Sequence, residues 1–163
     1  MEENINKENN SPKGIVHVIL SYEYSLFLIA IILGILCDHI FHTKIIDSID
    51  LSYMGIFMIF IGSSLVYWAQ RSTSVSKSKT EEERKTDFFY KGPYKYNRNP
   101  THFGLFVMSL GLGFILNSVF SIIFIFIIHL IAKRTFLKKQ DKILEERYGE
   151  SFSSYKNKVK DWI

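Results

Sequence analysis

The chain of 163 residues is poor in the features that support small disulfide-linked folds and common soluble active sites. Its one cysteine, Cys37, excludes a disulfide scaffold. The sequence contains no P-loop, no G-x-G-x-x-G turn and no G-x-S-x-G nucleophile motif, which excludes the common nucleotide-binding and hydrolase sites. Basic residues outnumber acidic ones by 20 to 16, but helix-turn-helix, zinc-finger and RNP patterns are all missing. We therefore expect no nucleic-acid partner.

Long apolar runs take the place of these features. Residues 51–70 carry no charge, and residues 101–132 contain no Asp, Glu, Lys or Arg. A membrane-spanning helix needs about 20 mainly apolar residues, and residues 22–41 also qualify, with Asp38 near one end. Because the bilayer core offers no water to the backbone, such runs must be helical.

The run 101–132 is too long for one span, and Asn117-Ser118 interrupts it. The sequence therefore predicts an all-α polytopic membrane protein whose last two spans form a tight hairpin, followed by a cytosolic C-terminal helical tail. The four expected transmembrane helices cover 22–41, 51–70, 101–116 and 119–136.

The distribution of positive charge predicts the topology. Nineteen of the 20 basic residues lie in the segments 1–21, 71–99 and 133–163. Because positive loops stay inside, both termini are expected in the cytoplasm. The many Ile, Lys and Asn residues indicate an AT-rich genome, and a bacterial inner (plasma) membrane is expected. A single domain over 1–163 would then comprise a polar segment 1–21, a transmembrane region 22–136 with a cytosolic loop 71–100, and a cytosolic tail 137–163.

Two groups of ionisable residues in or near the spans allow alternative interpretations. Asp38, His39 and His42 have metal-ligand spacing, but we favour polar side chains that reach the outer interface, and we expect no metal. His129 lies inside the last span. An intramembrane histidine is either functional or a neutral group bonded to a neighbouring helix, and the sequence leaves both interpretations open.

The most informative stretch is the segment 92–104, GPYKYNRNPTHFG. Pro100 suits the first position of a helix, and Asn99 before it should be extended. Arg98 is thereby held at the membrane surface beside the positive end of a helix. A guanidinium fork in that position suits a carboxylate or a phosphate.

The same stretch resembles the G-P-Y-x-x-x-R-[HN]-P-x-[YH]-x-G signature of the isoprenylcysteine carboxyl methyltransferase and phospholipid methyltransferase superfamily. The resemblance covers about residues 50–163. It departs from the commoner pattern at Asn99, where His is usual, and at Gln140-Asp141, where a Glu pair is usual. The tail positions that match the family pattern are Gln140, Asp141, Tyr148, Gly149, Phe152, Tyr155, Val159 and Trp162.

The resemblance implies an integral membrane methyltransferase that uses S-adenosylmethionine in a cytosolic pocket. Its acceptor, a lipophilic or membrane-associated carboxylate or amine, would enter from the bilayer. Arg98 would bind the cofactor's carboxylate, and Asp141 or Glu145 would hold its amine or ribose or take a proton from an amine acceptor. The implied catalytic residues are Arg98, Asp141 and Glu145, and the implied cofactor-binding residues are Tyr94, Tyr96, Arg98, Asn99, Pro100, His102, Gly104, His129, Gln140, Asp141 and Tyr148.

Two alternative functions remain open. Membrane reductases of the steroid-reductase type have a similar R-H-P-N-Y element and use NADPH. They typically follow it with an acidic residue, whereas Gly104 here precedes Leu105, which disfavours a reductase. A non-catalytic membrane protein with the same fold would fit the departures at Asn99 and Gln140.

Overall fold

The computed structural model describes residues 12–43, 49–76 and 91–161, and this part of the chain is helical, with no strand. The predicted all-α class is therefore confirmed. Trp162 and residues 77–90 of the loop 71–100 lie outside the described residues. The elements are α2 (Pro12–Phe41), α3 (Ile49–Ser76), the 3₁₀ helix η2 (Gly92–Lys95), α5 (Pro100–Ile115), α6 (Val119–Ala132), the π-helical turn η3 (Lys133–Leu137), α7 (Lys138–Tyr148) and α8 (Glu150–Lys158).

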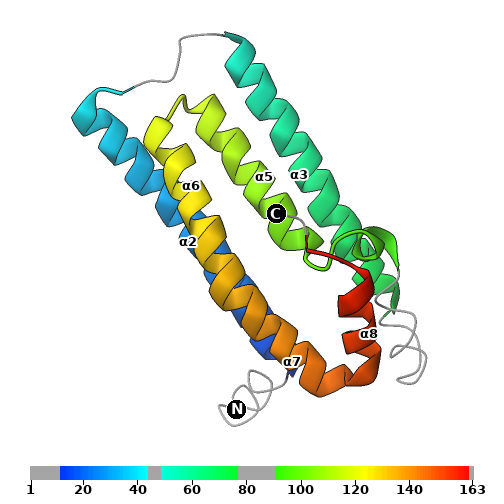
Figure 1. Cartoon of the computed structure of the whole chain (residues 1–163). Coiled ribbons are helices and arrows are strands. Elements are labelled where there is room, and N and C mark those ends of the chain that lie inside the picture. The colour runs from blue at the N-terminus through cyan, green and yellow to red at the C-terminus, as the bar shows by residue number, and fades with distance from the viewer. Residues whose placement is uncertain (1–11, 44–48, 77–90, 162–163) are drawn as a thin grey trace, which may run out of the picture.

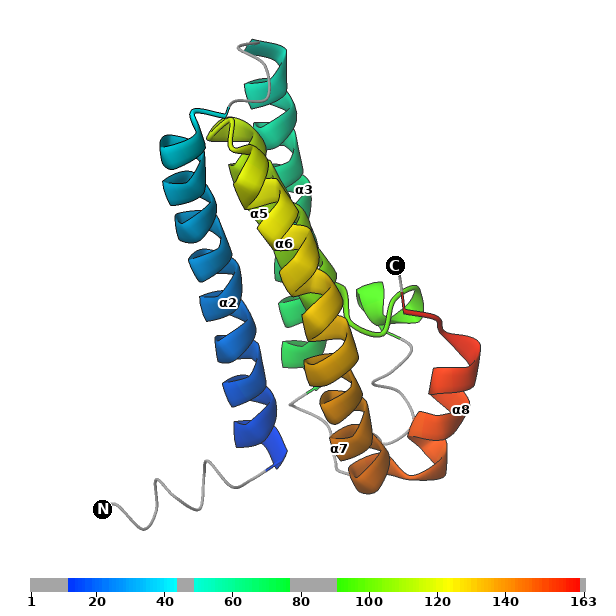
Figure 2. The same ribbon diagram turned by 60° about the vertical axis from the view of Figure 1, so that its left-hand side comes forward.

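Helices α2, α3, α5 and α6 run up and down in an antiparallel bundle (Figure 1). The beginning of α2, the end of α3, the beginning of α5, and α7 with α8 all lie at one end of it (Figure 2). Three helical stretches, Ser21–Phe41, Asp50–Ser72 and Val119–Glu146, are long and apolar enough to cross a membrane. The fourth expected span, α5, has 16 residues, or roughly 24 Å at 1.5 Å per residue. The chain is thus a polytopic helical membrane protein in which one helix of the bundle, α5, is short.

Two element boundaries differ from the sequence prediction. Helix α2 begins at Pro12, well before the expected start at residue 22. The helix of the last span does not end near residue 136, because α6 continues through η3 into α7 as far as Tyr148. Residues 133–148 include good helix formers and neither proline nor glycine, so nothing stops the helix there. It stops at Gly149, whose φ is 55°, as is typical of a glycine directly after the end of a helix.

Helices α3 and α5 approach each other through glycines spaced seven residues apart on each helix. A Cβ atom at Gly104 would lie 2.9 Å from the carbonyl oxygen of Gly62, and one at Gly111 would lie 2.6 Å from that of Gly55. Small residues allow this close packing in a membrane, where no hydrophobic force drives helices together. Helix α5 therefore packs mainly on α3, although a short turn connects it to α6 in the predicted hairpin.

The turn between α5 and α6 confirms the predicted interruption at Asn117-Ser118. Asn117 adopts a left-handed φ of 52°, and the Ser118 hydroxyl accepts a hydrogen bond from the Ser121 amide at 3.1 Å. Asp38 accepts hydrogen bonds from the Ser118 hydroxyl and, at 3.4 Å, from the Phe120 amide. Asp38 is half-buried at this turn, and its carboxylate is stabilised at the positive end of α6. His39 lies exposed.

Replacing Ser118 by alanine is expected to lower the free energy of unfolding by about 1 kcal/mol, because the first turn of α6 loses its cap. Thermal unfolding in detergent, followed by circular dichroism, measures the effect. Ser25→Ala is the matched control, since that exposed hydroxyl bonds to the carbonyl of Ser21 one turn earlier and caps no helix. Equal melting temperatures for the two variants would contradict a stabilising role for the cap.

Candidate active site

The motif segment is shaped by its prolines and asparagines. Pro93 lies in the first turn of η2 and Pro100 in that of α5, where a missing N–H costs little. Asn99 is non-helical, with φ −126° and ψ 60°, and its amide donates to the Asn97 side-chain oxygen at 3.0 Å. This fixed backbone directs Arg98 toward α7.

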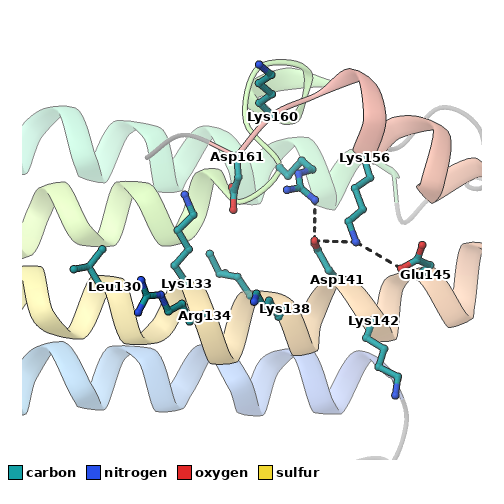
Figure 3. Close-up of a pocket in the computed structure, with 12 residues that line it drawn as sticks. Leu130, Lys133, Arg134, Lys138, Asp141, Lys142, Glu145, Lys156, Lys160 and Asp161 are labelled. Carbon is teal, nitrogen blue, oxygen red and sulfur yellow. Dashed lines mark hydrogen bonds and ion pairs between the residues drawn. The ribbon is translucent and has the colours of Figure 1, made fainter.

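Arg98 meets the acidic residues of the tail. Its guanidinium donates to the Asp141 carboxylate at 2.8 Å, with both side chains about one-sixth exposed (15% and 16%). The Lys156 ammonium lies 3.5 Å from Asp141 and 3.6 Å from Glu145, as Figure 3 shows. Ser153 adds a hydrogen bond of 3.1 Å to Glu145. This ion network joins the motif loop to both tail helices.

A pocket of about 860 Å³ surrounds this network. Its volume lies within the range of roughly 300–1,000 Å³ that is typical of small-molecule sites. Seven of the twelve lining residues are basic, three are acidic and two are leucines, so the pocket favours an anionic group. The lining residues are Arg98, Leu130, Lys133, Arg134, Leu137, Lys138, Asp141, Lys142, Glu145, Lys156, Lys160 and Asp161 (Figure 3).

The π-helical turn η3 supplies part of this lining. Lys133, Arg134 and Leu137 all belong to it and all line the pocket. Single π turns inside longer helices occur frequently at functional sites. The pocket therefore lies where the long α6–α7 helix changes its winding.

Three of the expected site residues, Arg98, Asp141 and Glu145, come together in the pocket. Asn99 lies at its edge, because its side-chain amide donates to Asp161 at 3.2 Å. Pro100 is buried at the start of α5.

The expected aromatic residues lie outside the set that lines the pocket. Tyr94 is half-buried, and its carbonyl accepts a hydrogen bond from the Tyr155 hydroxyl at 2.6 Å. Burial raises the pKa of Tyr94, against a hydrogen bond with Thr101 that lowers it. Tyr96 is 56% exposed, and Tyr148 packs on the tail cluster of Phe152, Tyr155 and Val159.

Gly104 and Gln140 are also outside the pocket lining. Gly104 contacts α3, as described above, and Gln140 is half-buried on α7. His102 and His129 lie together in the bundle, with the Nε2 atom of His102 3.1 Å from the Nδ1 atom of His129. The roles that the resemblance implies for these four residues stay predictions.

Sequence reasoning missed two sets of residues. Glu23, which lies in the expected span 22–41 and bonds to His102, received no role, although any ionisable residue inside a span is a candidate functional group. The basic residues from position 133 onward were treated only as a topology signal. Six basic pocket residues were thereby overlooked, namely Lys133, Arg134, Lys138, Lys142, Lys156 and Lys160, and Asp161 was missed as well.

Fold and site together define a helical membrane protein with a cationic pocket at the end of the bundle where the motif loop meets the tail. A family model described as phospholipid methyltransferase matches residues 51–151, which include α3, the motif, the hairpin and α7. The chain belongs to the phospholipid methyltransferase family and is by that membership a membrane methyltransferase. Comparison with curated proteins and with solved structures finds no match.

Proposed function

We propose that this protein transfers the methyl group of S-adenosylmethionine to the amine headgroup of a phospholipid at the cytosolic face of a bacterial inner membrane. The observation that carries the proposal is the Arg98–Asp141 ion pair, which the family motif and the tail bring together inside a cationic pocket. Family membership supports methyl transfer and a phospholipid acceptor.

The residues of the pocket suit the cofactor's polar groups. S-adenosylmethionine carries a carboxylate and an ammonium on one end. Arg98 pairs with Asp141 through one nitrogen, while its buried Nε atom has no hydrogen-bond partner among the described residues. A buried donor of this kind fits a carboxylate. Asp141 and Glu145, one helical turn apart, suit the ammonium or the ribose hydroxyls.

The remaining cations suit the phosphate of the acceptor. Lys133, Arg134 and Lys138 follow Leu130 along the α6–α7 helix, with Leu137 between them, so this side of the pocket combines apolar and basic side chains. A lipid could keep its chains beside the bundle and its phosphate among these cations. Methyl transfer from a bound sulfonium cofactor then needs mainly alignment and exclusion of water.

A ligand screen tests the proposed function. S-adenosylhomocysteine at a hundredfold excess over its Kd should stabilise the purified protein by about 2.7 kcal/mol, whereas NADPH should not. Vesicles that contain phosphatidylethanolamine, incubated with labelled S-adenosylmethionine, should yield methylated lipid. Stabilisation by NADPH alone would favour a reductase, and stabilisation by neither ligand would favour a non-catalytic protein.

The cytoplasmic location of both termini follows from the charge distribution and predicts a labelling pattern. In a Cys37→Ala background, a cysteine at exposed Ser154 should react with a membrane-impermeant maleimide only after the cells are opened. A cysteine at exposed His42, at the other end of the bundle, should react in intact cells. The opposite pattern would invert the topology and place the pocket outside.

A further inference from the structure

Three ionisable side chains from three helices form a hydrogen-bonded chain inside the bundle. Glu23 of α2 bonds to the Nδ1 atom of His102 of α5 at 3.2 Å, and the Nε2 atom of His102 bonds to the Nδ1 atom of His129 of α6 at 3.1 Å. The three residues are 1%, 4% and 2% exposed. Ionisable residues within membrane spans are costly and mark functional sites.

Both ends of this chain carry a polar atom without a partner. The Oε1 atom of Glu23 and the Nε2 atom of His129 are buried, and neither has a hydrogen-bond partner among the described residues. Most buried polar atoms in proteins are paired, so each exception calls for an explanation. A purely structural clamp would not need a free nitrogen at its end.

The direction of the hydrogen bonds determines the state of that nitrogen. If Glu23 is ionised it can only accept, and a neutral His102 then carries its proton on Nδ1 and accepts at Nε2. His129 must then donate through Nδ1, which leaves its Nε2 atom as a bare lone pair. The same logic prepares a histidine base wherever a carboxylate orients an imidazole.

We propose that the Nε2 atom of His129 is the general base that takes the proton from the amine of the methyl acceptor, and that Glu23 and His102 are positioning residues that hold it in the basic tautomer. This inference rests on the proposed function and names a protonated primary amine as the group that the site accepts. It replaces the expected proton acceptors Asp141 and Glu145, which are both held in ion pairs.

The location of His129 suits an acceptor that remains in the bilayer. His129 is not among the residues that line the pocket, but its neighbour Leu130 lines it, as does Lys133 one helical turn further along. The Phe106 ring stacks on the imidazole, with 4.0 Å between centroids, and shields it from water. The bound headgroup has to bring its amine to the covered Nε2 atom, within the hydrogen-bond reach that proton transfer needs.

Proton transfer to His129 frees the acceptor nitrogen for methyl transfer. The N–H bond of the ammonium breaks, and the proton moves to Nε2 of His129, which becomes an imidazolium. The freed nitrogen lone pair forms a bond to the methyl carbon while the carbon–sulfur bond breaks and its electron pair stays on sulfur. The imidazolium is stabilised by His102 and by the negative charge of Glu23, and it returns its proton to water when the product leaves.

The charged and titratable groups near His129 come from each helix that surrounds it. They are Glu23 from α2, His102 from α5 and Lys133 from η3, directly after α6. The negative charge of Glu23 favours the imidazolium form of His129, whereas the positive charge of Lys133 opposes it. Both groups therefore affect the pH dependence of the variants.

The variant His129→Gln tests the proposal with phosphatidylethanolamine as the acceptor. Methyl transfer at neutral pH should fall by about 10² to 10⁴-fold, the usual contribution of a general base. The loss should shrink as the pH rises toward the pKa of the amine, because the acceptor then arrives deprotonated. Glu23→Gln should cause a smaller loss, since the amide still accepts the hydrogen bond but lacks the charge. His39→Gln, an exposed histidine at the other end of α2, is the matched control.

A second measurement does not depend on turnover. ¹⁵N NMR of the histidine-labelled protein should show His129 protonated at Nδ1 and bare at Nε2, and His129→Gln should bind S-adenosylhomocysteine as tightly as the parent. A protonated Nε2, an unchanged rate in His129→Gln, or a rate loss that is the same at every pH would overturn the proposal. Weaker cofactor binding would also overturn it and assign His129 to the cofactor. If the parent protein methylates no lipid, the proposed function itself fails, whereas the NMR result still decides the tautomer.

Discussion

Replacing Arg98 by alanine should abolish methyl transfer, chiefly by weakening cofactor binding. The lost contact is charge-assisted and partly buried. Its removal leaves the cofactor's carboxylate unpaired, at a cost of roughly 2–5 kcal/mol. This corresponds to cofactor affinity that is about 30-fold to 5,000-fold weaker. Asp141 keeps Lys156 as an ionic partner at 3.5 Å, so the tail should remain folded. Calorimetry with S-adenosylhomocysteine on detergent-purified protein measures the effect.

Two further variants separate geometry from charge at this position. Arg98→Lys should restore only part of the affinity, because an ammonium lacks the planar fork of guanidinium. Lys95→Ala should have a mild effect, because this exposed lysine lies over the Tyr96 ring and outside the pocket lining. If Arg98→Ala binds S-adenosylhomocysteine as tightly as the parent, then another cation holds the carboxylate.

Replacing Gly104 by leucine should destabilise the bundle strongly. The first added atom would lie 2.9 Å from the backbone carbonyl of Gly62 and 2.8 Å from the Val66 side chain. A backbone carbonyl cannot rotate away, so α5 would have to move off α3. Overpacking of this kind costs about 1–3 kcal/mol, and the upper part of that range is expected here. Thermal unfolding and the yield of monodisperse protein report the loss.

The matched control adds the same side chain where space is open. Ser64 lies exposed on α3, so Ser64→Leu should leave the melting temperature unchanged. The comparison also decides between two roles for Gly104. If Gly104→Leu keeps its stability but loses affinity for S-adenosylhomocysteine, then this glycine contacts the cofactor, as the family resemblance implies.

Local signals in the sequence were enough to predict most of the fold. The uncharged runs identified the spans, and Asn117-Ser118 identified the hairpin turn. The continuity of α6 with α7 was missed, because the start of the basic sequence was interpreted as the end of a helix. Charge marks where a helix leaves the bilayer, but it does not stop the helix.

The site was predictable only in part, because it depends on contacts between distant segments. Arg98 and Asp141 were chosen from a motif, whereas their ion pair joins residues 43 positions apart. Gly104 matched the same motif, but the sequence alone does not show that Gly104 packs closely against Gly62. Glu23 lies 79 residues before its partner His102, and no spacing rule connects them.

The short length of α5 affects how deep the motif loop lies in the membrane. Its neighbour α3 has a span of 23 residues, roughly 34 Å, and a Cβ atom at Gly92 would lie 3.4 Å from the indole nitrogen of Trp68 near the end of that span. Tryptophan marks the level of the lipid headgroups. A bilayer thins locally to match a short helix, so the membrane surface beside α5 should be indented toward the motif loop. An acceptor lipid would then meet the pocket without being lifted out of its leaflet.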